Sequence, residues 1–79
     1  MRYETTTTLA PAAALAAAER FFAGGFGLEV RQRGPQMLGL EGSGGHVAVS
    51  ILGEHPTTLE IETREWDTPV TEFIADLPR

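Results

Sequence analysis

Alternation of apolar and polar residues is the feature that most restricts how this chain can fold. Over residues 26–66, four short segments carry an apolar side chain at every second position, and they read FGLEVRQR, QMLGLEG, HVAVSIL and TLEIETREW. This two-residue period is typical of β-strands that bury one side. Short turns containing glycine or proline separate the segments, so neighbouring segments are expected to pair as an antiparallel meander.

The apolar members of each segment mark the side of the sheet expected to face the core. They are Phe26, Leu28, Val30, Leu38, Leu40, Val47, Val49, Ile51, Leu59 and Ile61. The alternate positions, Arg31 and Arg33 among them, are expected to point the opposite way. Segments with one apolar and one polar side are typical of an antiparallel sheet that helices cover on one face only.

A strand and a helix are predicted ahead of the meander. Residues 2–9 (RYETTTTL) alternate and are rich in threonine, whose β-branched side chain favours a strand. A helix is expected to begin at Pro11, because a proline in the first helical position loses no hydrogen bond. It is expected to end at Gly24-Gly25, where glycine accepts the left-handed C-terminal conformation. Its expected buried stripe consists of Leu15, Ala18 and Phe22.

A second helix is predicted near the C-terminal end. Thr68 is a good N-cap, Pro69 suits the first helical position, and Asp67 adds negative charge at the positive end of the helix dipole. Apolar residues follow at the i, i+3, i+4 and i+7 spacing of a helix with one buried face. They are Val70, Phe73, Ile74 and Leu77.

The predicted fold is a single α+β domain over residues 1–79 in the order β-α-β-β-β-β-α. The first strand must find an edge, most simply beside the last strand. This gives a five-stranded antiparallel sheet in spatial order 1-5-4-3-2, with two helices packed on one face. The layout resembles the TATA-binding-protein-like and helix-grip group, which includes START and pollen-allergen lipid binders. The resemblance is one of topology, without shared motif residues. It implies a site for a small apolar ligand between helices and sheet, whose lining would include Tyr3, Phe22, Phe26 and Trp66.

Composition narrows the possible partners. The net charge is −5, and the six basic residues are dispersed arginines, so the basic stripe of a nucleic-acid-binding protein is missing. The lack of cysteine excludes a disulfide scaffold and fits a reducing compartment. The most apolar stretch, residues 9–18, is too short for a membrane span and contains Pro11, which disfavours a signal peptide. We therefore expect a cytoplasmic protein with neither nucleic acid nor membrane as partner. The alanine-rich, lysine-free composition is typical of GC-rich bacterial genomes.

A cluster of glycines, Gly42-Ser43-Gly44-Gly45, raises the question of a phosphate-binding loop. Such a loop follows a strand and opens a helix, whose free N–H groups meet the anion. Here the glycines are expected to open another strand, and no Lys-Ser or Lys-Thr pair follows them. A hairpin turn that needs positive φ angles accounts for them better.

No catalytic residues, cofactor or metal site are predicted. His46 and His55, the only histidines, flank one predicted strand and would lie about 30 Å apart at about 3.3 Å per residue, too far to share a metal. Glu60 and Glu62 alternate on the outer side of the last strand beside the first strand, where cross-strand ion pairing with arginine is favoured over acid–base chemistry. An enzyme would need a cleft that contains at least two of these four residues. We therefore expect the protein not to be an enzyme.

The outer side of the sheet is the strongest functional candidate. Its centre is expected to carry small or apolar residues bordered by charged ones, and these residues are Met37, Gly39, Ala48, Ser50 and Leu52. An apolar centre with a charged rim is the anatomy of a contact surface. Edge-to-edge pairing of residues 26–33 with a twin is a second route, although Arg31 and Arg33 can guard that edge. The sequence thus favours a non-enzymatic self-association or partner-binding module, most simply a homodimer. The alternative is a helix-grip-type binder of a small apolar ligand.

Overall fold

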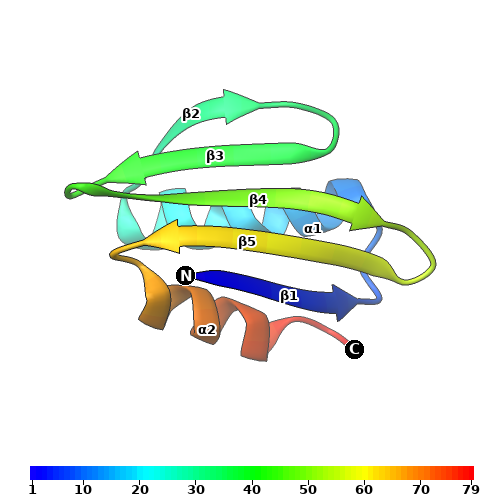
Figure 1. The fold of residues 1–79 in the computed structure, drawn as a ribbon. Coiled ribbons are helices and arrows are strands. Elements are labelled where there is room, and N and C mark those ends of the chain that lie inside the picture. Colours follow the sequence, from blue (N-terminus) through cyan, green and yellow to red (C-terminus); the bar gives the residue numbers. More distant parts are fainter.

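The strands lie in the order β1-β5-β4-β3-β2 in the computed structural model, which describes residues 1–79 (Figure 1). The elements are β1 (Arg2–Thr7), α1 (Pro11–Glu19), the π-helical turn η1 (Arg20–Gly25), β2 (Glu29–Arg33), β3 (Met37–Gly42), β4 (Gly45–Gly53), β5 (Thr57–Arg64) and α2 (Asp67–Asp76). Every neighbouring pair of strands is antiparallel. The predicted α+β class, element order and sheet order are confirmed.

The core lies between the sheet and the two helices. Alternate residues of the strands point into it, and they include Leu38, Leu40, Val47, Val49, Leu59 and Ile61, each exposed by 2% or less. Helix α2 adds Val70, Phe73 and Leu77 to the same cluster. In Figure 1, α1 runs behind β4 and β5, and α2 lies next to β1. Since one face of each strand is buried in this way, the polar face of the sheet is left uncovered. No helix of the chain combines the length and the apolar composition needed to cross a lipid bilayer.

Helix α1 buries a stripe that differs from the predicted one. Ala14, Ala18 and Phe22 are fully buried, whereas Leu15 is only half-buried. The two alanines let the helix lie close to β3 and β4, and the larger ring of Phe22 fills the space where the helix widens into η1. The buried stripe therefore begins at Ala14 and continues at the i+4 and i+8 positions, and Leu15 does not belong to it.

The end of this helix also differs from the prediction. Gly24 and Gly25 lie inside η1, and the left-handed residue is Gly27, with φ of 76°. Hydrogen bonds from the Gly27 N–H to the Ala23 carbonyl and from the Leu28 N–H to the Phe22 carbonyl, both 3.1 Å, close the helix. The wider π turn delays the left-handed residue, which still has to be a glycine.

Strand β2 contains a bulge, and as a result the Arg33 side chain lies on the opposite face of the sheet from the predicted one. Its register runs from Val30 opposite Leu40 to Gln32 opposite Gly39, which leaves Arg31 as the extra residue. One extra residue moves the following side chains to the other face of the sheet. The prediction that Arg33 points away from the helices is therefore wrong. Its guanidinium forms an ion pair with Glu19 of α1, with Nη2 and Oε2 3.1 Å apart.

Helix α2 starts earlier than predicted. Its first residue is Asp67, its N-cap is Trp66, and no side chain caps it. The prediction of Thr68 as N-cap is wrong because the Val70 N–H already bonds to the Trp66 carbonyl at 3.0 Å, which places Thr68 within the first turn. Pro69 becomes the third helical residue, where a missing N–H still costs no intrahelical bond.

Candidate functional site

The uncovered face of the sheet is organised in three rows of side chains that run across the strands. The pairing registers define these rows, which we name hairpin row, middle row and far row. The hairpin row, nearest the β3–β4 turn, holds Arg64, His46, Glu41 and Glu29. The middle row holds Arg2, Glu62, Ala48, Gly39 and Gln32. The far row holds Glu4, Glu60, Ser50 and Met37.

The five residues expected at the centre of this face lie on the adjacent strands β3 and β4, and we call them the central patch. Gly39 lies opposite Ala48, and Met37 lies opposite Ser50. These four residues are half-buried although no other element covers them. Leu52, at the register shift between Ile51 and Gly53, is 53% exposed. The patch is therefore flat around Gly39 and Ala48, with an exposed apolar side chain at one end.

Charged residues of β1 and β5 border the central patch on one side. The Arg2 guanidinium lies 3.6 Å from the Glu60 carboxylate and 3.4 Å from the Glu62 carboxylate, so the predicted cross-strand pairing is present. Glu4, however, lies directly opposite Glu60 and has no ion pair of its own. Like charges in directly opposed positions of a sheet repel each other. This corner thus carries three carboxylates for one guanidinium.

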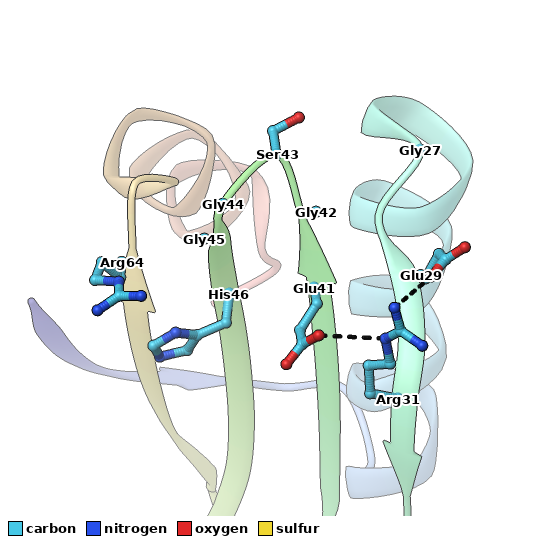
Figure 2. A pocket seen from close by; sticks show the side chains of 10 residues that line it. All are labelled: Gly27, Glu29, Arg31, Glu41, Gly42, Ser43, Gly44, Gly45, His46 and Arg64. Atoms are coloured by element: carbon cyan, nitrogen blue, oxygen red, sulfur yellow. Dashed lines mark ion pairs between the residues drawn. The ribbon is translucent and has the colours of Figure 1, made fainter.

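A polar hollow of about 590 Å³ lies at the hairpin end of the same face (Figure 2). None of its ten lining residues is hydrophobic. Arg31 forms ion pairs with Glu29 at 2.8 Å and with Glu41 at 3.3 Å, on one side of the hollow. Arg64 lies on the other side, next to His46, and forms no ion pair within the chain (Figure 2). The hollow is open to solvent and its charges are of mixed sign, so it lacks the features of an enclosed binding site.

The glycine cluster forms the hairpin between β3 and β4, as predicted. Ser43 and Gly44 have φ angles of 50° and 79°, the two positive values of a type I′ turn. Gly45 must be a glycine for a steric reason, which could not be predicted from the sequence. A Cβ atom there would lie 2.2 Å from the Arg64 carbonyl oxygen, because β4 begins where β5 ends in close contact.

The four residues expected to line a ligand site lie in different surroundings. Phe22 is fully buried, and Phe26, which was expected to point into the core, is 43% exposed because it precedes β2 at the helix end. The Phe26 ring meets the Trp66 ring edge-on at 5.8 Å between centroids. Tyr3 lies apart from these rings, and its hydroxyl donates a hydrogen bond to Asp67 at 2.9 Å.

That hydrogen bond changes the acidity of Tyr3. The bond to the Asp67 carboxylate, then desolvation and the charge of Asp67, raise the pKa of Tyr3 above its ordinary value of 10.0. The Tyr3–Asp67 contact joins β1 to the first turn of α2, so we assign it a structural role.

A small apolar hollow lies elsewhere, between α1 and α2. Its volume is about 190 Å³, and its lining includes Leu9, Ala17, Phe21, Phe73 and Leu77. Sequence reasoning did not single out this groove because it depends on how the two helices approach each other. It is smaller than the roughly 300 Å³ at which ordinary ligand pockets begin.

The histidines and acidic residues form no metal site. His46 lies near the start of β4, and His55 lies in the turn that follows the end of this strand. No group of three or more histidine, cysteine, aspartate or glutamate side chains is arranged to hold a metal ion.

Neither a comparison with models of known protein families nor a comparison with curated proteins finds a match for this chain.

Proposed function

We propose that this protein is a non-enzymatic cytoplasmic module that forms a homodimer through its uncovered sheet face. The observation that carries the proposal is the central patch, whose small and apolar residues occupy the middle of a sheet face that no helix covers. A sheet normally buries its apolar positions against another layer. A chain of 79 residues without disulfides also gains stability from a partner subunit.

The area of the face is sufficient for a dimer of moderate affinity. Five strands spaced about 4.8 Å apart, with side chains over about 25 Å of their length, give a face of about 600 Å². Two such faces would bury about 1,200 Å² in total, which is the lower end of specific protein interfaces. We therefore expect a dissociation constant in the micromolar range.

The sheet edges are less suited to self-association. The β2 edge is short, bulged at Arg31 and flanked by Arg33, and these are features that prevent edge-to-edge pairing. Residues near the other end of the chain cover the last part of the β1 edge, where the Thr8 N–H bonds to the Pro78 carbonyl at 3.1 Å and Arg79 donates to the Thr6 carbonyl at 3.5 Å. These contacts favour the face over the edges.

Binding of a small apolar ligand, as the resemblance to helix-grip proteins implies, is the second candidate. The hollow between α1 and α2 is the observation in its favour, since its lining is mostly apolar. A screen of thermal stability with fatty acids, flavins and nucleotides distinguishes the two functions. A ligand-binding protein would be stabilised strongly by one class, whereas a pure interaction module would not respond.

Light scattering coupled to size-exclusion chromatography tests the homodimer. At high micromolar concentration the wild-type protein should elute with twice the mass of the 8.5 kDa chain. The variant Ala48→Arg should elute as a monomer, because a long cation replaces a small side chain in the middle of the face. Ala13→Arg, on the exposed side of α1, is the matched control and should remain dimeric.

Circular dichroism of each variant shows whether it has folded, and Ser50→Arg provides a second disruption of the patch if Ala48→Arg has not. A folded wild-type protein that stays monomeric up to millimolar concentration would refute the proposal.

A further inference from the structure

We infer, on the basis of the proposed homodimer, that the two copies are related by a two-fold axis running across the strands along the middle row, so that Arg64 of each copy pairs with Glu60 of the other. The inference names the orientation of the second copy and the ion pairs that select it. It depends on the distribution of charge over the three rows of the uncovered face.

The charges that one chain leaves unbalanced lie on β5 on either side of the middle row. Glu60, in the far row, shares Arg2 with Glu62 and lies directly opposite the unpaired Glu4. Arg64, in the hairpin row, forms no ion pair within the chain, and Figure 2 shows it beside His46. The far row therefore has excess negative charge, and the hairpin row has an unpaired cation.

These two rows are symmetric about the middle row. Glu60 and Arg64 are each two residues from Glu62, which lies opposite Ala48 in the middle row. Side chains two residues apart on a strand share a face, so Glu60 and Arg64 are about 13 Å apart along β5. Rotation by 180° about an axis across the strands at Glu62 and Ala48 exchanges the far row and the hairpin row. It brings Arg64 of one copy above Glu60 of the other, twice in each dimer.

The separation of packed sheets is compatible with this contact. Two sheets that pack face to face lie about 10 Å apart with nearly aligned strands. Long side chains such as arginine and glutamate can meet across that gap. In the same arrangement, each residue of the middle row faces its own copy across the axis. Ala48 and Gly39 are small there and allow the sheets to approach closely, while Arg2 and Glu62 of the two copies meet as two guanidiniums and two carboxylates, a group without net charge.

An axis parallel to the strands gives a poorer match. Such an axis along β4 would place β5 over β3 of the other copy. Arg64 would then meet Glu41, which shares Arg31 with Glu29, and Glu60 would lie over Met37, still opposite Glu4 and without a new cation. The axis across the strands lays Glu41 over Met37 in the same way, so the cost of a carboxylate against this apolar side chain is common to both axes. Only the axis across the strands brings Arg64 to the corner of Glu4, Glu60 and Glu62, where three carboxylates share one guanidinium, and this contact favours it.

Charge-swap variants test this orientation. Arg64→Glu and Glu60→Arg should each weaken the dimer at least about tenfold, because each places like charges opposite each other twice. An equimolar mixture of the two variants should form a heterodimer with near wild-type affinity, since every contact then joins opposite charges. The double variant Arg64→Glu/Glu60→Arg should also dimerise. Sedimentation velocity measures each dissociation constant, and circular dichroism at low concentration verifies folding.

The possible outcomes separate the two proposals. The axis across the strands is supported if each single variant dimerises weakly and the mixture of the two restores the dimer. A dimer that Ala48→Arg disrupts but the charge swaps leave unchanged refutes this orientation and leaves the proposed homodimer intact. Restoration of Arg64→Glu by Glu41→Arg, and not by Glu60→Arg, would demonstrate the parallel axis instead. A wild-type protein that never dimerises refutes both proposals.

Discussion

Replacement of Gly45 by alanine tests the close contact between the start of β4 and the end of β5. The new Cβ atom would lie 2.2 Å from the Arg64 carbonyl oxygen, 2.7 Å from the Glu65 Cβ and 3.0 Å from the Trp66 Cδ1. The first two atoms belong to backbone or sit directly on it, so no side-chain rotation can relieve the overlap. The substitution must therefore push β4 away from the segment that links β5 to α2.

The expected loss of stability follows from these contacts. Overpacking of a well-packed site costs about 1–3 kcal/mol. Separation of the segments also weakens the 3.0 Å hydrogen bond from the Trp66 indole to the Gly42 carbonyl, worth about 1 kcal/mol. The sum, about 2–4 kcal/mol, is a large part of the roughly 4–12 kcal/mol typical of a chain this long. At about 4–8 °C per kcal/mol, the melting temperature should fall by about 10–30 °C.

Urea denaturation measures this loss, with circular dichroism and the fluorescence of Trp66, the only tryptophan, as signals. Gly44→Ala and Gly53→Ala are matched controls because a Cβ atom at either position would have no neighbour within 4 Å. Gly44→Ala should lower the free energy of unfolding by about 1–2 kcal/mol, the strain of an alanine at a φ of 79°. Gly53→Ala should leave the free energy of unfolding almost unchanged. If Gly45→Ala is no less stable than Gly44→Ala, the close contact is not the reason for a glycine at this position.

Two further predictions concern the helices and their contacts. Phe22→Ala should lower the free energy of unfolding by about 3–5 kcal/mol, because it removes a fully buried ring that packs on Phe73; thermal denaturation measures the change, and a loss under about 1 kcal/mol would contradict the described core. Because folding raises the pKa of Tyr3 above 10.0, the stabilisation is complete below pH 10.0 and is lost as the pH rises through the raised pKa. Near-ultraviolet absorbance of this only tyrosine should show the high midpoint, Asp67→Asn should lower it, and an unchanged midpoint would contradict the described contact.

The sequence predicts the sheet well because apolar alternation is continuous through β3, β4 and β5. In β2 the alternation stops at Val30, and the polar residues that follow contain no signal for the bulge at Arg31. The side of Arg33 therefore depends on pairing with β3, which only the structure shows. The buried side of α1 is also hard to predict, because a run of alanines is compatible with several buried stripes. Leu15, the largest residue of the run, suggests the wrong stripe.

The candidate surface was predictable in part. Alternation alone puts Ala48 and Ser50 on the outer face, because Val47 and Val49 must point into the core. The unbalanced charges were harder to predict, since they depend on register. Only the position of Glu4 opposite Glu60, and the absence of an ion pair at Arg64, show that the far row complements the hairpin row.

The pairing of β1 with β5 alone also affects how the protein is made. Arg2 of β1 bonds to Glu62 of β5, a residue that lies 60 positions further along the chain. During synthesis, β1 therefore leaves the ribosome long before its partner strand β5 exists. An apolar strand that waits in this state would invite aggregation. β1 and the residue after it instead carry threonine at all four positions from 5 to 8, which combines β-propensity with hydration. Thr5 and Thr7 become buried only on the finished sheet, where the Thr7 hydroxyl bonds to the Pro78 carbonyl at 2.7 Å. The threonine run thus lets the first strand remain hydrated until the last strand arrives.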